Sequence, residues 1–104
     1  MAAKLTAGEI WAPNLYRDEV AKYLGRGGFA YLQVRRHGDK LVIESGSARN
    51  RTQHARLRRL TRQLWTLDMS VRPKVWEPTF VRESLQNVLK FLTEQAPWVL
   101  APRD

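Results

Sequence analysis

Residues 53–76, QHARLRRLTRQLWTLDMSVRPKVW, decide the fold because they fit either strands or one helix. The leucines at positions 57, 60, 64 and 67 recur every three or four residues, which is typical of an amphipathic helix. From Trp65 to Val71, however, apolar and polar residues alternate, which is typical of a strand with one buried face. Arg72-Pro73 follows as a turn signal, so the chain from 65 to 76 predicts a hairpin.

We favour an antiparallel meander in this region, with a further strand over 55–60 ahead of the hairpin. Its weak point is the connection at 61–63, which contains no Gly, Asn or Pro. No Gly or Pro interrupts the chain from 47 to 72, so intrinsic propensity favours a helix. The alternative, in which residues 52–69 form a basic amphipathic helix, therefore stays open at this point.

The preceding stretch predicts another hairpin. Residues 29–36 begin with aromatic and branched side chains, and residues 40–44 form a second apolar run. Gly38-Asp39 between them is a two-residue turn with glycine first, which suits a tight hairpin.

A helix is predicted on each side of the strands. Residues 15–24 place their apolar side chains on one helical face, with Asn14 as the N-cap and Gly25 as a left-handed C-cap. Residues 80–95 form the second helix, with Thr79 as its N-cap. Its apolar stripe consists of Val81, Leu85, Val88, Leu89 and Leu92.

The prediction is therefore one α+β domain over residues 1–104. An N-terminal helix precedes an antiparallel β-meander of four to five strands, and a C-terminal helix packs on one sheet face. Over residues 29–95, this order of elements resembles that of single-strand-binding proteins of the purine-rich-element and transcription-coactivator type. The resemblance lies in the order of elements only, so it implies no role for any residue, and it adds slightly to an expectation of nucleic-acid binding.

Composition excludes several classes of protein. The chain has 104 residues and no cysteine, which excludes disulfide scaffolds, cysteine zinc sites, iron–sulfur clusters and thiol catalysis. No apolar run approaches the length of a membrane span, and the first six residues do not open a signal peptide. We therefore expect a cytoplasmic protein that does not enter a membrane.

No catalytic or cofactor-binding constellation is apparent. The serines lie in no strained-elbow motif, the carboxylates are scattered, and residues 25–28 lack the context of a phosphate-binding loop. His37 and His54 have no nearby carboxylate, and both are expected at the surface. We expect no enzymatic activity, no metal and no cofactor.

Arginine is the informative residue type. The net charge is +8, and no Asp or Glu occurs from residue 45 through residue 67. This acid-free segment contains Arg49, Arg51, Arg56, Arg58, Arg59 and Arg62. The guanidinium group matches phosphate and stacks on bases, so the segment predicts a nucleic-acid surface, with single strands favoured and Trp65 as an adjoining stacking residue. Strand geometry would place Arg56 and Arg58 on one face and Arg59 on the other.

A second functional class remains open. The chain has four tryptophans and a clear apolar helix stripe, and these could form the interface of a homodimer or a groove for a protein partner. In that case the arginines would contact an acidic protein rather than nucleic acid.

Overall fold

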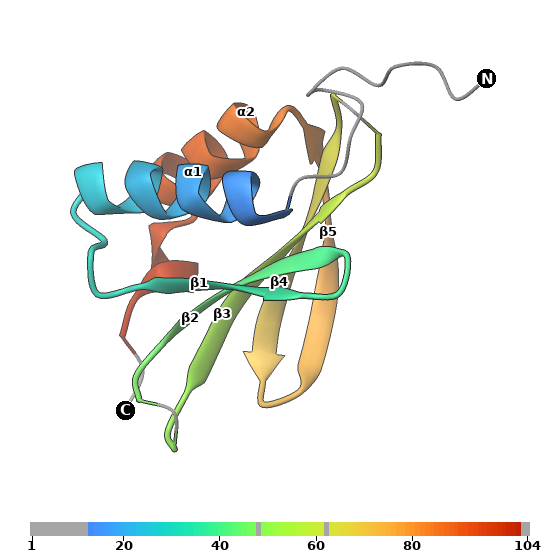
Figure 1. Cartoon of the computed structure of the whole chain (residues 1–104). Coiled ribbons are helices and arrows are strands. Elements are labelled where there is room, and N and C mark those ends of the chain that lie inside the picture. Colours follow the sequence, from blue (N-terminus) through green and yellow to red (C-terminus); the bar gives the residue numbers. More distant parts are fainter. Residues whose placement is uncertain (1–12, 48, 62, 103–104) are drawn as a thin grey trace.

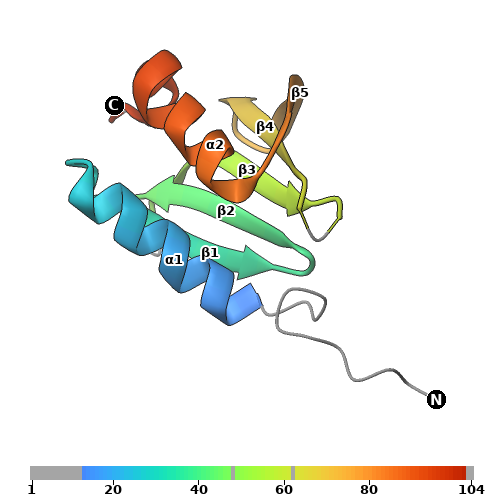
Figure 2. The same ribbon diagram turned by 90° about the horizontal axis from the view of Figure 1, so that it is seen from above.

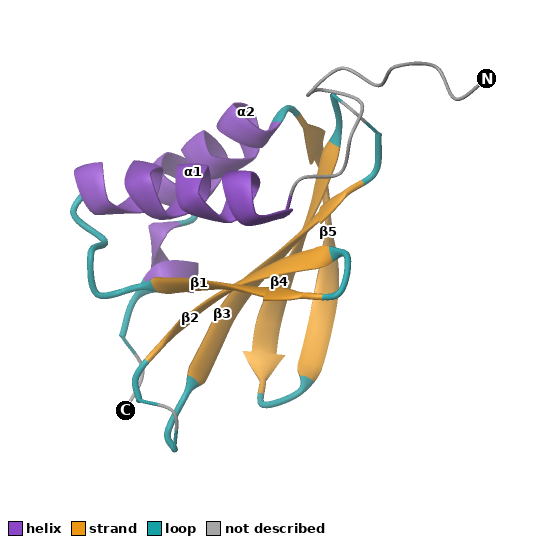
Figure 3. Ribbon diagram, viewed as in Figure 1, coloured by secondary structure: helices purple, strands orange, loops and turns teal. Residues whose placement is uncertain are grey.

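The computed structural model describes residues 13–47, 49–61 and 63–102. A helix, five strands and a C-terminal helical region follow one another along the chain (Figures 1 and 3). The elements are α1 (Pro13–Arg26), β1 (Gln33–His37), β2 (Lys40–Ser45), β3 (Thr52–Arg59), β4 (Trp65–Arg72), β5 (Val75–Glu83), α2 (Leu85–Lys90), the π-helical turn η1 (Phe91–Gln95) and the 3₁₀ turn η2 (Pro97–Leu100). The strands lie in the order β1-β2-β3-β4-β5, and each pair is antiparallel, which confirms the α+β prediction.

The helices lie together over one face of the sheet (Figure 2). Strand residues that face them are fully buried, including Leu41, Ile43 and Leu57. The helical region contributes further core side chains: Val20, Leu24, Val88, Leu89, Leu92, Val99 and Leu100. Val42 is also buried, yet it lies outside this core cluster because alternation turns it to the opposite face.

Residues 53–69 form two strands and not a helix. Side chains alternate between the two faces of a strand, and this alternation directs Leu57, Trp65 and Leu67 toward the core, where each is at most 2% exposed. Leu60 and Leu64 belong to the helical spacing, but they lie in the connection between the strands and are 44% and 38% exposed. Burial of the alternating set therefore outweighs the helical periodicity of the leucines.

A side chain closes the connection that lacks Gly, Asn and Pro. The hydroxyl of Thr61 accepts hydrogen bonds from the backbone N–H groups of Gln63 and Leu64, at 3.2 and 3.1 Å. The N–H of Leu60 donates to the carbonyl of Leu64 at 2.8 Å. Threonine here supplies the local hydrogen bonding that a more typical turn residue would provide.

The prediction of a helix over 80–95 is wrong at its beginning. Strand β5 continues to Glu83, and α2 begins at Leu85 with the Ser84 hydroxyl as its N-cap, accepting from the N–H of Asn87. Thr79, the predicted cap, lies within β5 and donates its hydroxyl to the carbonyl of Leu67 on β4 at 2.8 Å. Val81 packs against the core from a strand, so its spacing from Leu85 was coincidental.

The predicted ends of the first helix also shift. Asn14 and Gly25 both lie inside α1, so neither is a cap residue. Gly28 is the residue with a positive φ, at 91°, and the N–H of Phe29 returns to the carbonyl of Leu24 at 2.9 Å. The left-handed residue therefore comes three positions later than predicted.

His54 is fully buried, which corrects the expectation that it lies at the surface. The register between β2 and β3 shifts next to it, as in a β-bulge, and the shift turns the ring toward the C-terminal turn η2. Nδ1 lies 3.0 Å from the carbonyl of Val99 and donates to it, and Nε2 lies 2.8 Å from the hydroxyl of Ser45. His54 thus has a structural position between the sheet and η2.

Candidate nucleic-acid interface

A row of basic side chains crosses the sheet on the face turned away from the helices. Residues directly opposite one another on antiparallel strands lie on the same face. The register aligns His37, Lys40, Arg58, Thr66 and Arg82, one residue from each of the five strands. We call this set the basic row. Neighbouring strands are about 4.8 Å apart, so the charges are closely spaced.

The basic row places two like charges directly opposite each other. Lys40 and Arg58 are register partners, an arrangement that destabilises a sheet in the absence of a counter-charge. One carboxylate lies beside the pair, and Lys40 Nζ is 3.0 Å from Asp39 Oδ1. The hydrogen bond from Lys40 holds the pKa of Asp39 below its ordinary value, and the charges of Lys40 and Arg58 act in the same direction. One carboxylate beside three cations leaves the row positively charged.

A second row is more nearly neutral. It aligns Arg35, Val42, Arg56, Asp68 and Pro78 across the sheet. Arg56 pairs with Asp68, with Nη2 and Oδ2 2.8 Å apart, and its guanidinium lies 4.6 Å from the ring centre of Trp76. Val42 lies between its register partners Arg35 and Arg56 and is only 3% exposed. This network fixes the centre of the uncovered face without adding much net charge.

The predicted arginines are divided between the two sides of the sheet. Arg56 and Arg58 share the uncovered face, as strand alternation predicts, and Arg59 lies on the face toward α1, with its guanidinium 5.6 Å from the ring centre of Tyr16. Arg49 and Arg51 are exposed in the connection between β2 and β3. Arg62 lies outside the described residues.

Trp65 lies in the core and not at the interface. It is 2% exposed and makes an edge-on contact with Tyr16 of α1, with ring centres 5.2 Å apart. A base cannot reach a ring in this position, so the stacking role predicted for Trp65 does not fit the structure. Trp76, which is partly buried on the uncovered face beneath Arg56, is the aromatic residue that adjoins the arginines there.

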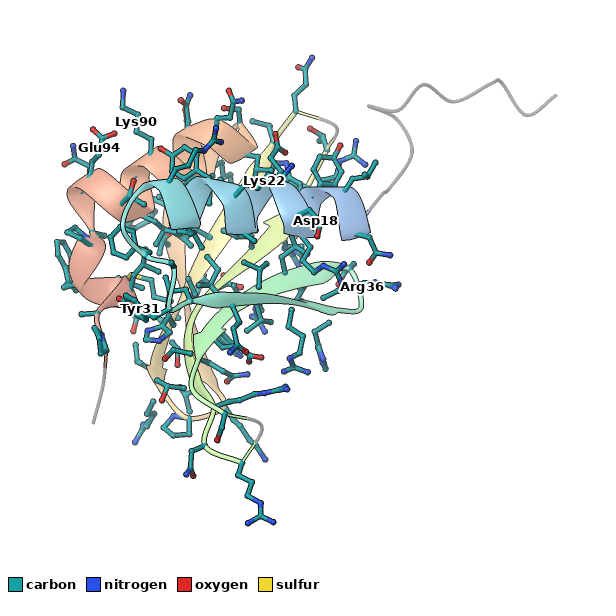
Figure 4. All side chains as sticks on the ribbon, turned by 60° about the vertical axis from the view of Figure 1, so that its left-hand side comes forward. Asp18, Lys22, Tyr31, Arg36, Lys90 and Glu94 are labelled. Carbon is teal, nitrogen blue, oxygen red and sulfur yellow. The ribbon has the colours of Figure 1, made fainter. Side chains whose placement is uncertain are left out.

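The helical side of the molecule carries charges of both signs. Figure 4 shows Asp18 and Lys22 on α1 and Lys90 and Glu94 on the C-terminal helical region, among the exposed side chains of that layer. Arg17 pairs with the neighbouring Asp18, at 3.4 Å. The uncovered sheet face, with its basic row, differs from this mixed surface and is the stronger candidate for contact with a polyanion.

Three residues of the uncovered face were not predicted from the sequence: Arg35, Lys40 and Arg82. Arg35 and Lys40 could have been found by continuing the alternation of the first hairpin beyond its turn. Arg82 could not, because it was assigned to a helix. These residues come from β1, β2 and β5, so the surface is assembled from distant parts of the chain and not from one arginine-rich segment.

Among the described residues, no group of three His, Asp or Glu side chains is arranged to hold a metal ion. No helix in the described part of the chain is both long and apolar enough to cross a membrane. Comparison of the chain with protein-family models, with curated proteins and with solved structures finds no match. The geometry of the uncovered sheet face is therefore the basis for a functional proposal.

Proposed function

We propose that this protein is a nucleic-acid-binding module that binds single strands on the uncovered face of its sheet. The observation that carries the proposal is the basic row, in which Lys40 and Arg58 are directly opposed and Arg82 lies two strands away. Asp39 balances only one of these three cations, and a phosphate backbone supplies further negative charge. A row across five strands suits an extended strand better than a small anion.

Single strands are favoured over duplex because the surface is a sheet and not a protruding helix or ribbon that would enter a groove. Trp76 and the guanidinium of Arg56 provide flat groups near the row, and both kinds of group stack on bases. The backbone contacts carry no sequence information, so we expect weak sequence preference.

The test is a titration of fluorescently labelled single-stranded DNA, single-stranded RNA and duplex, followed by anisotropy at several salt concentrations. Each phosphate contact contributes a slope of about 0.7 in the logarithm of affinity against the logarithm of salt for single strands. Arg58→Gln and Arg82→Gln should each weaken binding and reduce the slope by about that amount. Absence of binding by the wild-type protein at about 50 mM salt would overturn the proposal.

A matched control separates a local contact from the general effect of charge. Arg17→Gln removes the same charge from α1, on the helical side of the molecule. We expect it to leave the affinity and the salt slope close to the wild-type values. An equal loss in Arg17→Gln and Arg58→Gln would show that only the net charge matters.

One observation favours a second candidate function, self-association. Phe80 on the edge strand β5 is fully exposed and, with Val81 and Phe91, supplies the apolar part of a groove of about 360 Å³ whose other lining residues are charged or polar. An apolar side chain on an edge strand marks a surface where a further strand can pair, and the occupant proposed is a second copy of this chain. Light scattering after size-exclusion chromatography tests it: a dimer that Phe80→Ser converts to a monomer supports this function, and a monomeric wild-type protein refutes it.

A further inference from the structure

A pocket lined mainly by charged and polar residues opens on the uncovered sheet face, at the end farther from the basic row. It has a volume of about 400 Å³ and lies between the connection after β2 and the turn that joins β4 to β5. Arg35, Glu44, Arg51, Gln53 and Lys74 are among its lining residues. On β2, Glu44 lies four residues from Lys40 of the basic row, a separation of about 13 Å along the strand.

A buried carboxylate holds two arginines at this pocket. The Glu44 side chain is 2% exposed, and its Oε1 lies 2.8 Å from Arg35 Nε and 3.5 Å from Arg51 Nη1. The side chains of Arg35 and Arg51 are themselves 42% and 37% exposed, so both remain partly open to solvent beside the buried carboxylate. Glu44 thereby orients two forked donors at the pocket and lowers the ordering cost that a ligand would otherwise meet.

Lys74 adds a third cation from the opposite side of the pocket. It is the one residue other than glycine, within the described part of the chain, that has a positive φ, at 62°. Pro73-Lys74 is the two-residue turn between the register partners Arg72 and Val75, and a positive φ at the second position is what such a turn requires. The turn thereby fixes the backbone of Lys74 beside the pocket.

The charge of the lining identifies the class of ligand. Three cations against one carboxylate leave two positive charges at the pocket. A phosphate monoester carries about −1.5 to −2 at neutral pH, whereas an internal phosphodiester of a nucleic acid carries a single negative charge. The monoester therefore matches the pocket more closely.

We propose that this pocket binds a phosphate monoester, held between Arg51 and Lys74 and supported by Arg35. Such a group occurs at the phosphorylated end of a strand and on a free mononucleotide. If the ligand is the phosphorylated end of a strand, this inference rests on the proposed function, because the rest of that strand would lie along the basic row.

The test compares three probes with the full chain: a single strand with a 5′-hydroxyl, the same strand with a 5′-phosphate, and the same strand with a 3′-phosphate. In a fourth arm, a nucleoside monophosphate competes with the strands, and its direct binding is measured by isothermal titration calorimetry. We expect one phosphorylated end to bind about tenfold more tightly than the unmodified strand, as charge-assisted hydrogen bonds to a dianion allow. If the mononucleotide competes but neither phosphorylated strand binds more tightly than the unmodified one, the ligand is a small phosphate monoester. That result would support the same pocket chemistry.

Variants show whether the preference comes from this pocket. Lys74→Asn removes the charge and keeps a residue that tolerates positive φ, and Arg51→Gln removes the other flanking cation. Each should abolish the preference for the phosphorylated strand and leave binding of the unmodified strand within about twofold of the wild type. Arg72→Gln is the control, because Arg72 is exposed two residues away and is not among the residues that line the pocket.

The outcomes separate this inference from the proposed function. Equal binding of phosphorylated and unmodified strands, with no competition by the mononucleotide, would overturn the phosphate pocket and leave nucleic-acid binding in place. A phosphate preference that survives in both Lys74→Asn and Arg51→Gln would also overturn it. Binding of the mononucleotide without binding of any strand would support the pocket and refute the proposed function.

Discussion

Replacing Leu57 with alanine should be strongly destabilising, whereas the same change at Leu60 should not. Leu57 is fully buried in the central strand β3, between its register partners Leu41 and Leu67, which are also fully buried. Strands on both sides limit collapse of the cavity, so we expect a loss at the upper end of the usual range for Leu→Ala, about 3–5 kcal/mol. Leu60 is 44% exposed beyond the end of β3, and we expect less than about 1 kcal/mol there.

Urea unfolding followed by circular dichroism measures both values. A loss of 3–5 kcal/mol is a large fraction of the stability of about 5–15 kcal/mol that is usual for a domain. It should shift the midpoint in proportion while the m-value stays close to that of the wild type. The two leucines lie three residues apart, so on a helix they would share one buried face. Losses that agree within about 0.5 kcal/mol would contradict the strand assignment and the reasoning from alternation.

Three further predictions concern local structure and are measured by the same unfolding experiment. Ser84→Ala should cost about 0.5–2 kcal/mol because it removes the N-cap of α2. Gly46→Ala should cost at least about 1–3 kcal/mol, because φ is 93° and the added methyl would lie 2.2 Å from a backbone oxygen; Gly25→Ala, which meets no atom within 4 Å inside α1, should instead be neutral or stabilising by up to about 1 kcal/mol. His54→Leu should cost about 1–3 kcal/mol by leaving buried polar partners without their hydrogen bonds, and His37→Leu at an exposed position should change little. Equal effects within either pair would show that the local contact is not what matters.

The parts of the fold that follow from short-range pattern were predictable. The first hairpin followed from the Gly38-Asp39 turn, and the second from alternation beginning at Trp65. The start of α2 could not be predicted, because Val81 satisfies the helical spacing by coincidence. Only the pairing of β5 with β4 shows that Val81 belongs to a strand. A tertiary contact of this kind outweighs local propensity and leaves no mark in the sequence.

The candidate surface was predictable only where it follows from the alternation of side chains along one strand. Alternation places Arg56 and Arg58 together, and it separates them from Arg59. The opposition of Lys40 and Arg58 depends on the register, and the bulge next to His54 changes that register farther along the same pair of strands. Trp65 was wrongly predicted to lie at the surface, because its closeness to arginines in the sequence does not show which side of the sheet it faces.

The strand order of the sheet has a consequence for how the chain reaches its native state. Each strand pairs with the strand before it, across connections of two, six, five and two residues. Loop closures this short cost little entropy, and a topology dominated by local pairings folds faster than a sheet of the same size assembled from distant segments. During synthesis from the N-terminus, every strand from β2 onward would emerge beside a partner that already exists. Residues of α1 are available from the start, but part of the apolar face of the nascent sheet stays exposed until α2, η1 and η2 deliver Leu89, Leu92 and Leu100. Completion of the core therefore waits for the last elements to be made.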